Sequence, residues 1–206
     1  MSLNYNPYGL QPALHESGIL RPAPTPGTIA SGYATQIFMN SPVQIDSGTP
    51  SGNLILATAL GAAGAGAAAN RIVGAFQGVE YTLTADGRRH VSNQWPSGTV
   101  ATNIVAWYTR DPNMTYEIQA NGSVPATAMG AQASITANTG ASGNTTTGFS
   151  TVGLDVQTAG SLTQASTNQL RIVGFSQAID NAPGDAYTVV QVKIAMHQDV
   201  ANQIAY

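Results

Sequence analysis

Hydrophobic and polar residues alternate with a period of two in several short stretches of the chain, and the clearest lies at 187–197. One face of this stretch carries Thr188, Val190, Val192, Ile194 and Met196, and the other carries a mixture of polar and apolar residues. A period of two places alternate side chains on opposite faces of a strand. We therefore expect a strand here with one buried face.

Other short stretches are rich in β-branched and aromatic residues and are separated by turn signals such as Asp86-Gly87 and Asn121-Gly122. Many short strands at this spacing are typical of a barrel or a sandwich, and no long stretch with the 3.6-residue period of a helix interrupts them. The fold class that we predict is all-β, with a single β-barrel or β-sandwich domain over residues 28–206. The further candidate strands are 29–38, 53–57, 72–81, 100–109, 116–120, 133–137 and 170–176.

Residues 1–27 differ from the rest because they hold five prolines. Each proline fixes its own φ and pushes the preceding residue out of the α region. We expect an extended, Pro-rich N-terminal arm that lies along another surface, either its own domain's or a neighbour's. The side chains expected to make this contact are Tyr5, Pro7, Tyr8, Leu10, Leu14, Ile19 and Leu20.

Two stretches cannot bury much apolar area. Residues 58–70 are almost pure Ala and Gly, and residues 138–150 are mainly Gly, Ser, Thr and Asn. Such compositions do not repay the entropy of ordering by themselves. Both stretches are expected to be surface loops at one end of the β domain, mobile unless a partner covers them.

One tetrapeptide occurs twice, as Arg71-Ile72-Val73-Gly74 and as Arg171-Ile172-Val173-Gly174. Two equivalent strands with similar packing needs explain the repeat as well as a duplication does. A glycine inside a strand fits a β-bulge or a barrel corner.

Only 8% of the residues are charged, against about 25% in an average protein, and the formal net charge is −3. Nucleic-acid binding needs clustered Lys and Arg, and the nearest approach to a cluster is Arg88-Arg89. The sequence therefore disfavours nucleic acid as a partner. No stretch is long and apolar enough for a membrane span, and the first residues lack the positive and apolar regions of a secretory signal, so we expect a soluble protein.

Catalytic and metal-binding patterns are missing from the sequence. The chain has no cysteine, and its three histidines, His15, His90 and His197, lie in unrelated contexts. No serine sits in a Gly-x-Ser-x-Gly elbow, no His-x-x-x-His pair occurs, and the acids form no specific pair. We therefore predict no catalytic residues, no cofactor and no metal site. A hydrolase that acts on cell wall through one of the histidines stays open as an alternative.

The two tryptophans have different surroundings. Trp107 lies in the middle of an apolar stretch and is expected in the core, whereas Trp95 stands beside the Pro96–Gly98 turn. Because tryptophan is enriched at protein interfaces, Trp95 is predicted to be an exposed interface anchor.

Six segments carry a resemblance to a known family. They are Asn6–Pro12, Ile29–Thr35, Gly74–Tyr81, Trp95–Thr99, and Asp111–Asn113 together with Tyr116–Ala120. Together they resemble the capsid decoration (cement) proteins that tailed phages encode beside their major capsid proteins. The resemblance implies a non-enzymatic subunit, often a homotrimer, that binds the major capsid protein on the outer surface of the virion after synthesis in the host cytoplasm.

The function expected from the sequence is thus that of a phage head decoration protein that stabilises the capsid shell, with the seven apolar arm side chains named above as its expected capsid contacts. Low charge fits a subunit that is packed against others, since a buried unpaired charge is costly. The alternative is a receptor- or glycan-binding module of the virion surface, such as a spike or fibre domain, with Trp95 and the loop tips at the ligand.

Overall fold

Twelve β-strands and one short 3-10 turn, η2 (Ala126–Ala128), make up the regular structure of the described residues. The computed structural model describes residues 4–18, 24–46, 51–58, 71–158, 162–163 and 168–200. Within these ranges no α-helix occurs, and the strands form two antiparallel sheets. The all-β prediction is confirmed.

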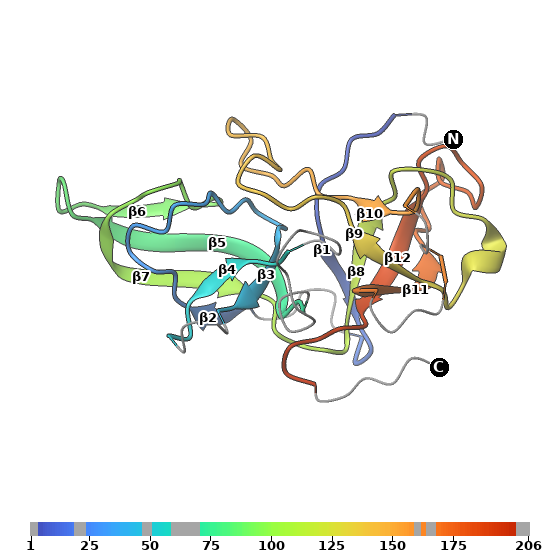
Figure 1. Cartoon of the computed structure of the whole chain (residues 1–206), viewed down its shortest axis with the longest axis horizontal. Coiled ribbons are helices and arrows are strands. Elements are labelled where there is room, and N and C mark those ends of the chain that lie inside the picture. Colours follow the sequence, from blue (N-terminus) through green and yellow to red (C-terminus); the bar gives the residue numbers. More distant parts are fainter. Residues whose placement is uncertain are drawn as a thin grey trace.

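The first sheet lies at the right in Figure 1 and curls until its strands nearly close a ring. Ala120, just after β8, forms a parallel bridge with Leu154 of β10, so five strands complete a small barrel that we call barrel A. β1 adds to it at the outer edge of β8. The sheet order is β1 (Gln11–His15), β8 (Met114–Gln119), β12 (Val189–Ile194), β11 (Leu170–Phe175), β9 (Gln132–Ile135) and β10 (Leu154–Asp155).

The second sheet lies at the left in Figure 1 and closes in the same way. Thr28, just after β2, forms a parallel bridge with Asn53, just before β4, and the five strands of this ring are barrel B. β6 (Arg89–Ser92) pairs with β5 outside the ring. The ring order is β2 (Thr25–Gly27), β7 (Ala101–Tyr108), β5 (Gly74–Leu83), β3 (Pro42–Ile45) and β4 (Leu54–Leu56).

The two barrels have the same topology. If the five ring strands of each barrel are numbered along the chain, the first is followed round the ring by the fifth, fourth, second and third in both barrels. The first and third strands close each ring through a parallel bridge, and every other pairing is antiparallel. The chain therefore contains a structural repeat.

The register of the strand pairs repeats as well. Gly78 and Gly174 each follow a β-bulge at the corresponding place of the fourth strand. This match makes Gly174 the structural equivalent of Gly78. The second Arg-Ile-Val-Gly tetrapeptide ends at Gly174 but the first ends at Gly74, so an alignment of the two tetrapeptides differs by four residues from the alignment of the two barrels. Four paired positions of barrel B correspond in this way to four of barrel A. In barrel B they are Thr25–Tyr108, Phe76–Tyr108, Val43–Gly74 and Ile45–Leu54. In barrel A they are, in the same order, Tyr116–Val192, Ile172–Val192, Ala133–Leu170 and Ile135–Leu154.

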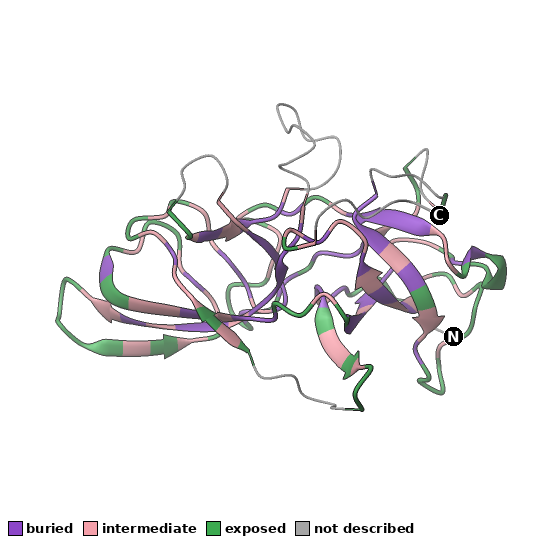
Figure 2. Cartoon of the chain, turned by 90° about the horizontal axis from the view of Figure 1, so that it is seen from below, coloured by how far each residue is buried: buried purple, intermediate pink, exposed green. Residues whose placement is uncertain are grey.

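Each barrel encloses its own hydrophobic cluster, and buried residues follow the inner faces of both (Figure 2). In β12, Val190, Val192 and Ile194 are buried while Val189, Gln191 and Lys193 are half-buried, as the alternation at 187–197 predicts. Ile72 and Ala75 belong to the cluster of barrel A although Ala75 lies in β5 of barrel B and Ile72 just before that strand. The two cores therefore meet at the start of β5.

Residues 29–38, predicted as a strand, form only isolated contacts. A turn at Ser31–Gly32 interrupts the stretch, with Gly32 at φ +78°, and only Ile37 pairs, with Trp95. The strands that the pattern missed are β1, β2, β3, β6 and β10, which have two to five residues each. So few residues give too short a pattern to detect.

The predicted loop at 138–150 is held against the body of the protein. Gly143 packs on the ring of Phe38 so closely that an added Cβ would lie 2.2 Å from it. Met39 N–H donates to the Gly148 carbonyl, and Ser150 N–H donates to the Met39 carbonyl. The other predicted loop, 58–70, lies outside the described residues except for Thr58.

Candidate interaction surfaces

The junction between the barrels, which we call the seam, is joined by side-chain amides of barrel A that bind backbone groups of barrel B. The buried Asn138 amide donates to the carbonyls of Pro42 at 2.9 Å and Ala57 at 2.8 Å. Gln169, fully buried, donates to the Thr58 carbonyl at 2.8 Å. Neutral amides cost less to bury than charged groups. A chain with few charges and many Asn and Gln residues can therefore form buried hydrogen bonds at the seam.

A buried hydroxyl pair forms the centre of the seam. Tyr116 of barrel A has its hydroxyl 2.9 Å from Thr109 Oγ1, which accepts the Ala75 N–H of barrel B at 3.0 Å. Burial raises the pKa of the Tyr116 phenol, so it stays neutral. At Gly74 the backbones approach so closely that an added Cβ would stand 1.4 Å from the Thr109 carbonyl oxygen. Only glycine fits there.

The segment after β12 extends the seam. Ile72 N–H donates to Met196 O, and Gln198 N–H donates to Ile72 O, both at 3.0 Å. Asp199 accepts from Arg110 at 2.6 and 3.2 Å, and this bond holds the pKa of the Asp199 carboxyl below its usual value. The barrels are thus bonded to each other at their cores and at the protein surface.

His197 is buried in this same segment. Its Nδ1 accepts the Asp199 N–H at 3.1 Å, and its side chain is 1% exposed. Burial lowers the pKa of the imidazole, with Asp199 partly opposing the effect. The ring is therefore held in its neutral form as a structural element of the seam.

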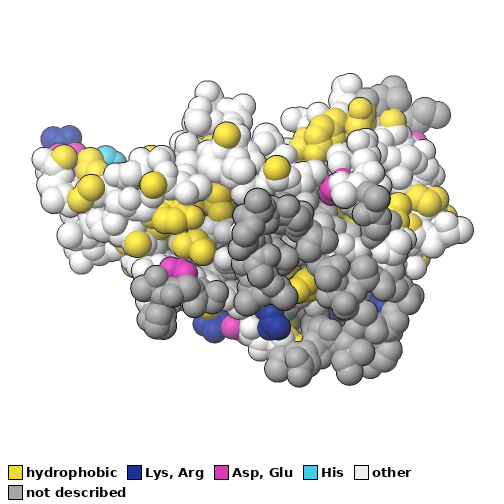
Figure 3. Space-filling model, viewed as in Figure 1, with side chains coloured by type: hydrophobic (Ala, Val, Ile, Leu, Met, Phe, Trp, Pro, Cys, Tyr) yellow, Lys and Arg dark blue, Asp and Glu magenta, His cyan; other side chains and the backbone are white. Residues whose placement is uncertain are grey.

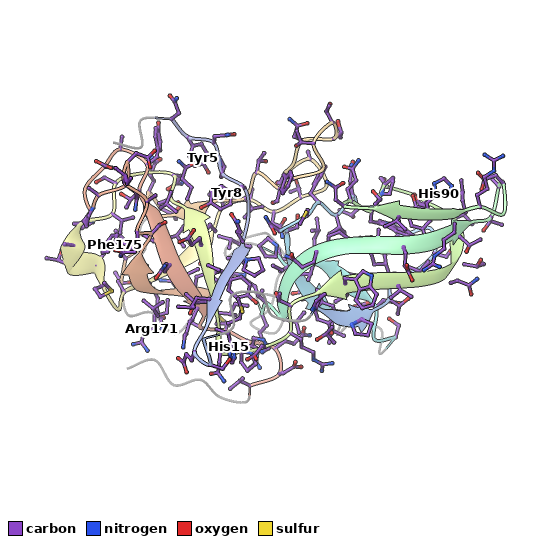
Figure 4. The ribbon with its side chains drawn as sticks, turned by 180° about the vertical axis from the view of Figure 1, so that it is seen from behind. Tyr5, Tyr8, His15, His90, Arg171 and Phe175 are labelled. Atoms are coloured by element: carbon purple, nitrogen blue, oxygen red, sulfur yellow. The ribbon has the colours of Figure 1, made fainter. Side chains whose placement is uncertain are left out.

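The described part of the N-terminal arm lies along its own barrel A (Figure 4). Pro7 and Leu10 are buried, and Leu10 belongs to the core cluster of barrel A. Gln119 holds the start of the arm, accepting from Asn6 N–H at 2.8 Å and donating to Asn4 O at 2.9 Å. Of the two surfaces left open by the sequence, the arm of this structure uses its own domain's.

The remaining arm residues are placed differently from one another. Tyr8 is half-buried, and Tyr5 and Leu14 are about 40% exposed. Ile19 and Leu20 lie outside the described residues. Of the predicted capsid-binding side chains, Pro7 and Leu10 are thus committed to this chain's core, whereas Tyr5 and Leu14 present free surface.

Prolines account for a difference between the two barrels. β1 pairs with β8, the first ring strand of barrel A, but no described strand pairs with the corresponding outer edge of β2 in barrel B. Pro24 and Pro26 occupy that edge and have no N–H to donate. Proline blunts strand edges in this way, so the Pro-rich segment protects barrel B from further pairing.

Trp95 is not the exposed anchor that the sequence predicts. Its side chain is 0% exposed and packs edge-on against Tyr81 at a centroid distance of 5.3 Å. The turn beside it directs the backbone outward while the ring enters the core of barrel B. A glycan-stacking role for Trp95 therefore loses its physical basis.

A histidine, an acid and a serine meet at one place. His15 Nε2 stands 3.0 Å from Asp111 Oδ2, and its Nδ1 stands 2.6 Å from Ser17 Oγ. Ser17 N–H also donates to Nδ1 at 3.1 Å, so the imidazole closes the turn that ends β1. The three side chains act as a local brace between β1 and the start of β8.

Metal-ligand clusters of three or more His, Asp or Glu side chains do not occur in the described part of the chain, nor does a helix there with the length and apolar character of a membrane span. Comparison of the chain with protein-family models, curated proteins and solved structures finds no match.

Proposed function

We propose that this chain is a capsid decoration protein of a tailed phage, which binds the outer surface of the major capsid protein lattice and opposes separation of neighbouring subunits. The observation that carries the proposal is the pair of barrels with one topology, bonded through a buried seam. Two similar units joined by buried hydrogen bonds are suited to contact two neighbouring positions of a repeating surface. The sequence resemblance supports the same role.

The surface chemistry supports attachment through shape and neutral contacts. The described ion pairs join groups of the same chain at its surface, such as Arg89 with Glu80 and Lys193 with Glu16. Few charges are left to attract a partner over distance. Attachment should therefore change little between low and high salt, because screening acts on charged contacts. Several weak contacts on one body add avidity.

Tyr5 and Leu14 are the arm side chains that we propose as capsid contacts, since they are exposed while the other described side chains of the predicted contact, Pro7, Tyr8 and Leu10, are buried or half-buried. Both lie on the part of the arm that covers barrel A. In this proposal the exposed side of the arm binds the major capsid protein, while its buried side, which includes Leu10, stays packed on barrel A.

The test mixes the purified chain with phage heads that lack it and measures occupancy by sedimentation and electron cryomicroscopy, together with the temperature at which heads rupture. We expect saturable binding and a raised rupture temperature. Tyr5→Ser with Leu14→Ser should reduce occupancy, while the matched control Val173→Ser, also 40% exposed, should not. Absence of wild-type binding would sink the proposed function; full occupancy by the double variant would remove only the arm contact.

A further inference from the structure

The two ends of the molecule's long axis carry the most exposed apolar side chains of the described residues. One end is the tip of the β5–β6–β7 hairpins, at the left of Figure 1, with Val91 80% and Val100 58% exposed. The other end comprises η2 and the segment 176–188 between β11 and β12, at the right, with Met129 52% and Ile179 107% exposed. The remaining exposed large apolar side chains of the described residues are near 40%.

These ends also hold two charged side chains that lack a partner among the described residues. Arg88 is at the hairpin tip, and within the described part of the chain its guanidinium has no acceptor. Asp180 is at the opposite end, and no described donor binds its carboxylate. All other charged groups of the described residues have a partner.

The unpaired charges have opposite signs at the two ends. Residues 84–92 hold two arginines and one acid, whose Oδ1 accepts the Arg88 N–H, and Arg89 is paired with Glu80 of β5, so Arg88 is the cation without a partner among the described residues there. Residues 176–188 hold two acids, Asp180 and Asp185, and no Lys or Arg. Figure 3 shows basic side chains at the left extremity, with acidic, histidine and hydrophobic side chains beside them.

We propose that copies of this chain associate head to tail, with the hairpin tip of one copy (Arg88, Val91, Val100) against the η2 end of the next (Asp180, Ile179, Met129). The apolar side chains supply the buried area, and the Arg88–Asp180 pair selects opposite ends over like ends, because charge complementarity fixes register and like charges repel. Such a contact is heterologous, so it generates a closed ring or a filament. The proposal does not depend on capsid binding.

The experiment is sedimentation of the purified full chain over a range of concentrations. We expect reversible association, weakened at least about tenfold by Arg88→Glu or by Asp180→Arg, because each change faces like charges. The double variant Arg88→Glu with Asp180→Arg should regain association. Ile179→Ser should weaken it, whereas Val173→Ser, on the outer face of β11, should not.

Mixing the two single charge variants separates the possible geometries. In a head-to-tail contact, the glutamate introduced at position 88 of one variant meets the arginine introduced at position 180 of the other. The two unaltered ends also match, so the mixture should associate better than either variant alone. A wild-type chain that stays monomeric at all concentrations would overturn the proposal. So would a dimer that responds to Arg88→Glu but not to Asp180→Arg, since it would join like ends. Circular dichroism of each variant checks that the fold is kept.

Discussion

The side chain of Gln198 binds both backbone groups of Ile45. Its Oε1 accepts the Ile45 N–H and its Nε2 donates to the Ile45 carbonyl, each at 2.7 Å. Gln198 follows the last strand of barrel A and Ile45 ends β3 of barrel B, so the amide takes the place that a neighbouring strand would fill. The contact joins positions 153 residues apart in the chain.

Replacing Gln198 with Ala should lower the free energy of unfolding by about 1–3 kcal/mol, because two half-buried backbone groups lose their partner. Urea denaturation followed by fluorescence measures this change. Gln177→Ala is the matched control, since its exposed amide contacts only the nearby Phe175 carbonyl. Equal effects of the two substitutions would show that the seam contact is absent in solution.

Gly74→Ala should destabilise the protein by more than about 3 kcal/mol or prevent folding, because the new methyl group would overlap the Thr109 backbone. Gly122→Ala is milder by expectation, since its nearest neighbour is the Val156 side chain at 3.2 Å, which can shift. Soluble yield and the denaturation midpoint are the measurements. A Gly74→Ala protein as stable as wild type would contradict the close approach of β5 to the end of β7.

Leu10→Ala should cost about 2–5 kcal/mol because it empties a fully buried site in barrel A. Leu14→Ala, at a 40% exposed position of the same arm, should cost much less. Hydrogen exchange adds a local readout, as loss of the arm would expose the β8 amides that pair with β1. Equal, small effects at both positions would mean that the arm is not docked on its own barrel.

Deletion of residues 2–21 should likewise destabilise barrel A. The sequence alone suggests that such a deletion leaves the β domain folded, but the structure places Leu10 in the core and β1 in the sheet. A truncated chain with an unchanged denaturation midpoint would favour the expectation from sequence over the docked arm.

Acidification should destabilise the protein through His197. Its folded-state pKa lies below the usual value of 6.5, so between the two values the unfolded chain binds more protons, and stability falls as the pH drops through that window. Denaturation midpoints at about pH 7.5 and about pH 5.5 measure the slope. His197→Gln should flatten it, while His90→Gln, at a 41% exposed side chain, should not. Asp199, with its lowered pKa, contributes only at more acidic pH.

The sequence by itself determined the fold class and the longer strands. In β12 the two-residue period is uninterrupted, so Val190, Val192 and Ile194 are assigned to the core without knowledge of any neighbour. The shortage of charge is also a property of the chain alone, because it is compositional and no tertiary contact alters it. The histidines are different, since the fold brings His15 to Asp111 from a distant part of the chain.

Tertiary structure decided the rest, because it depends on contacts between distant residues. Trp95 stands beside a turn in the sequence, yet its ring enters a core built from strands on both sides of it in the chain. The repeated barrel topology lies in strand pairings such as Val43 with Gly74 and Ala133 with Leu170, whose residue types differ between the two barrels. The two Arg-Ile-Val-Gly tetrapeptides are similar in sequence but do not occupy equivalent positions in the two barrels. Strand pairing, and not residue identity, sets the register.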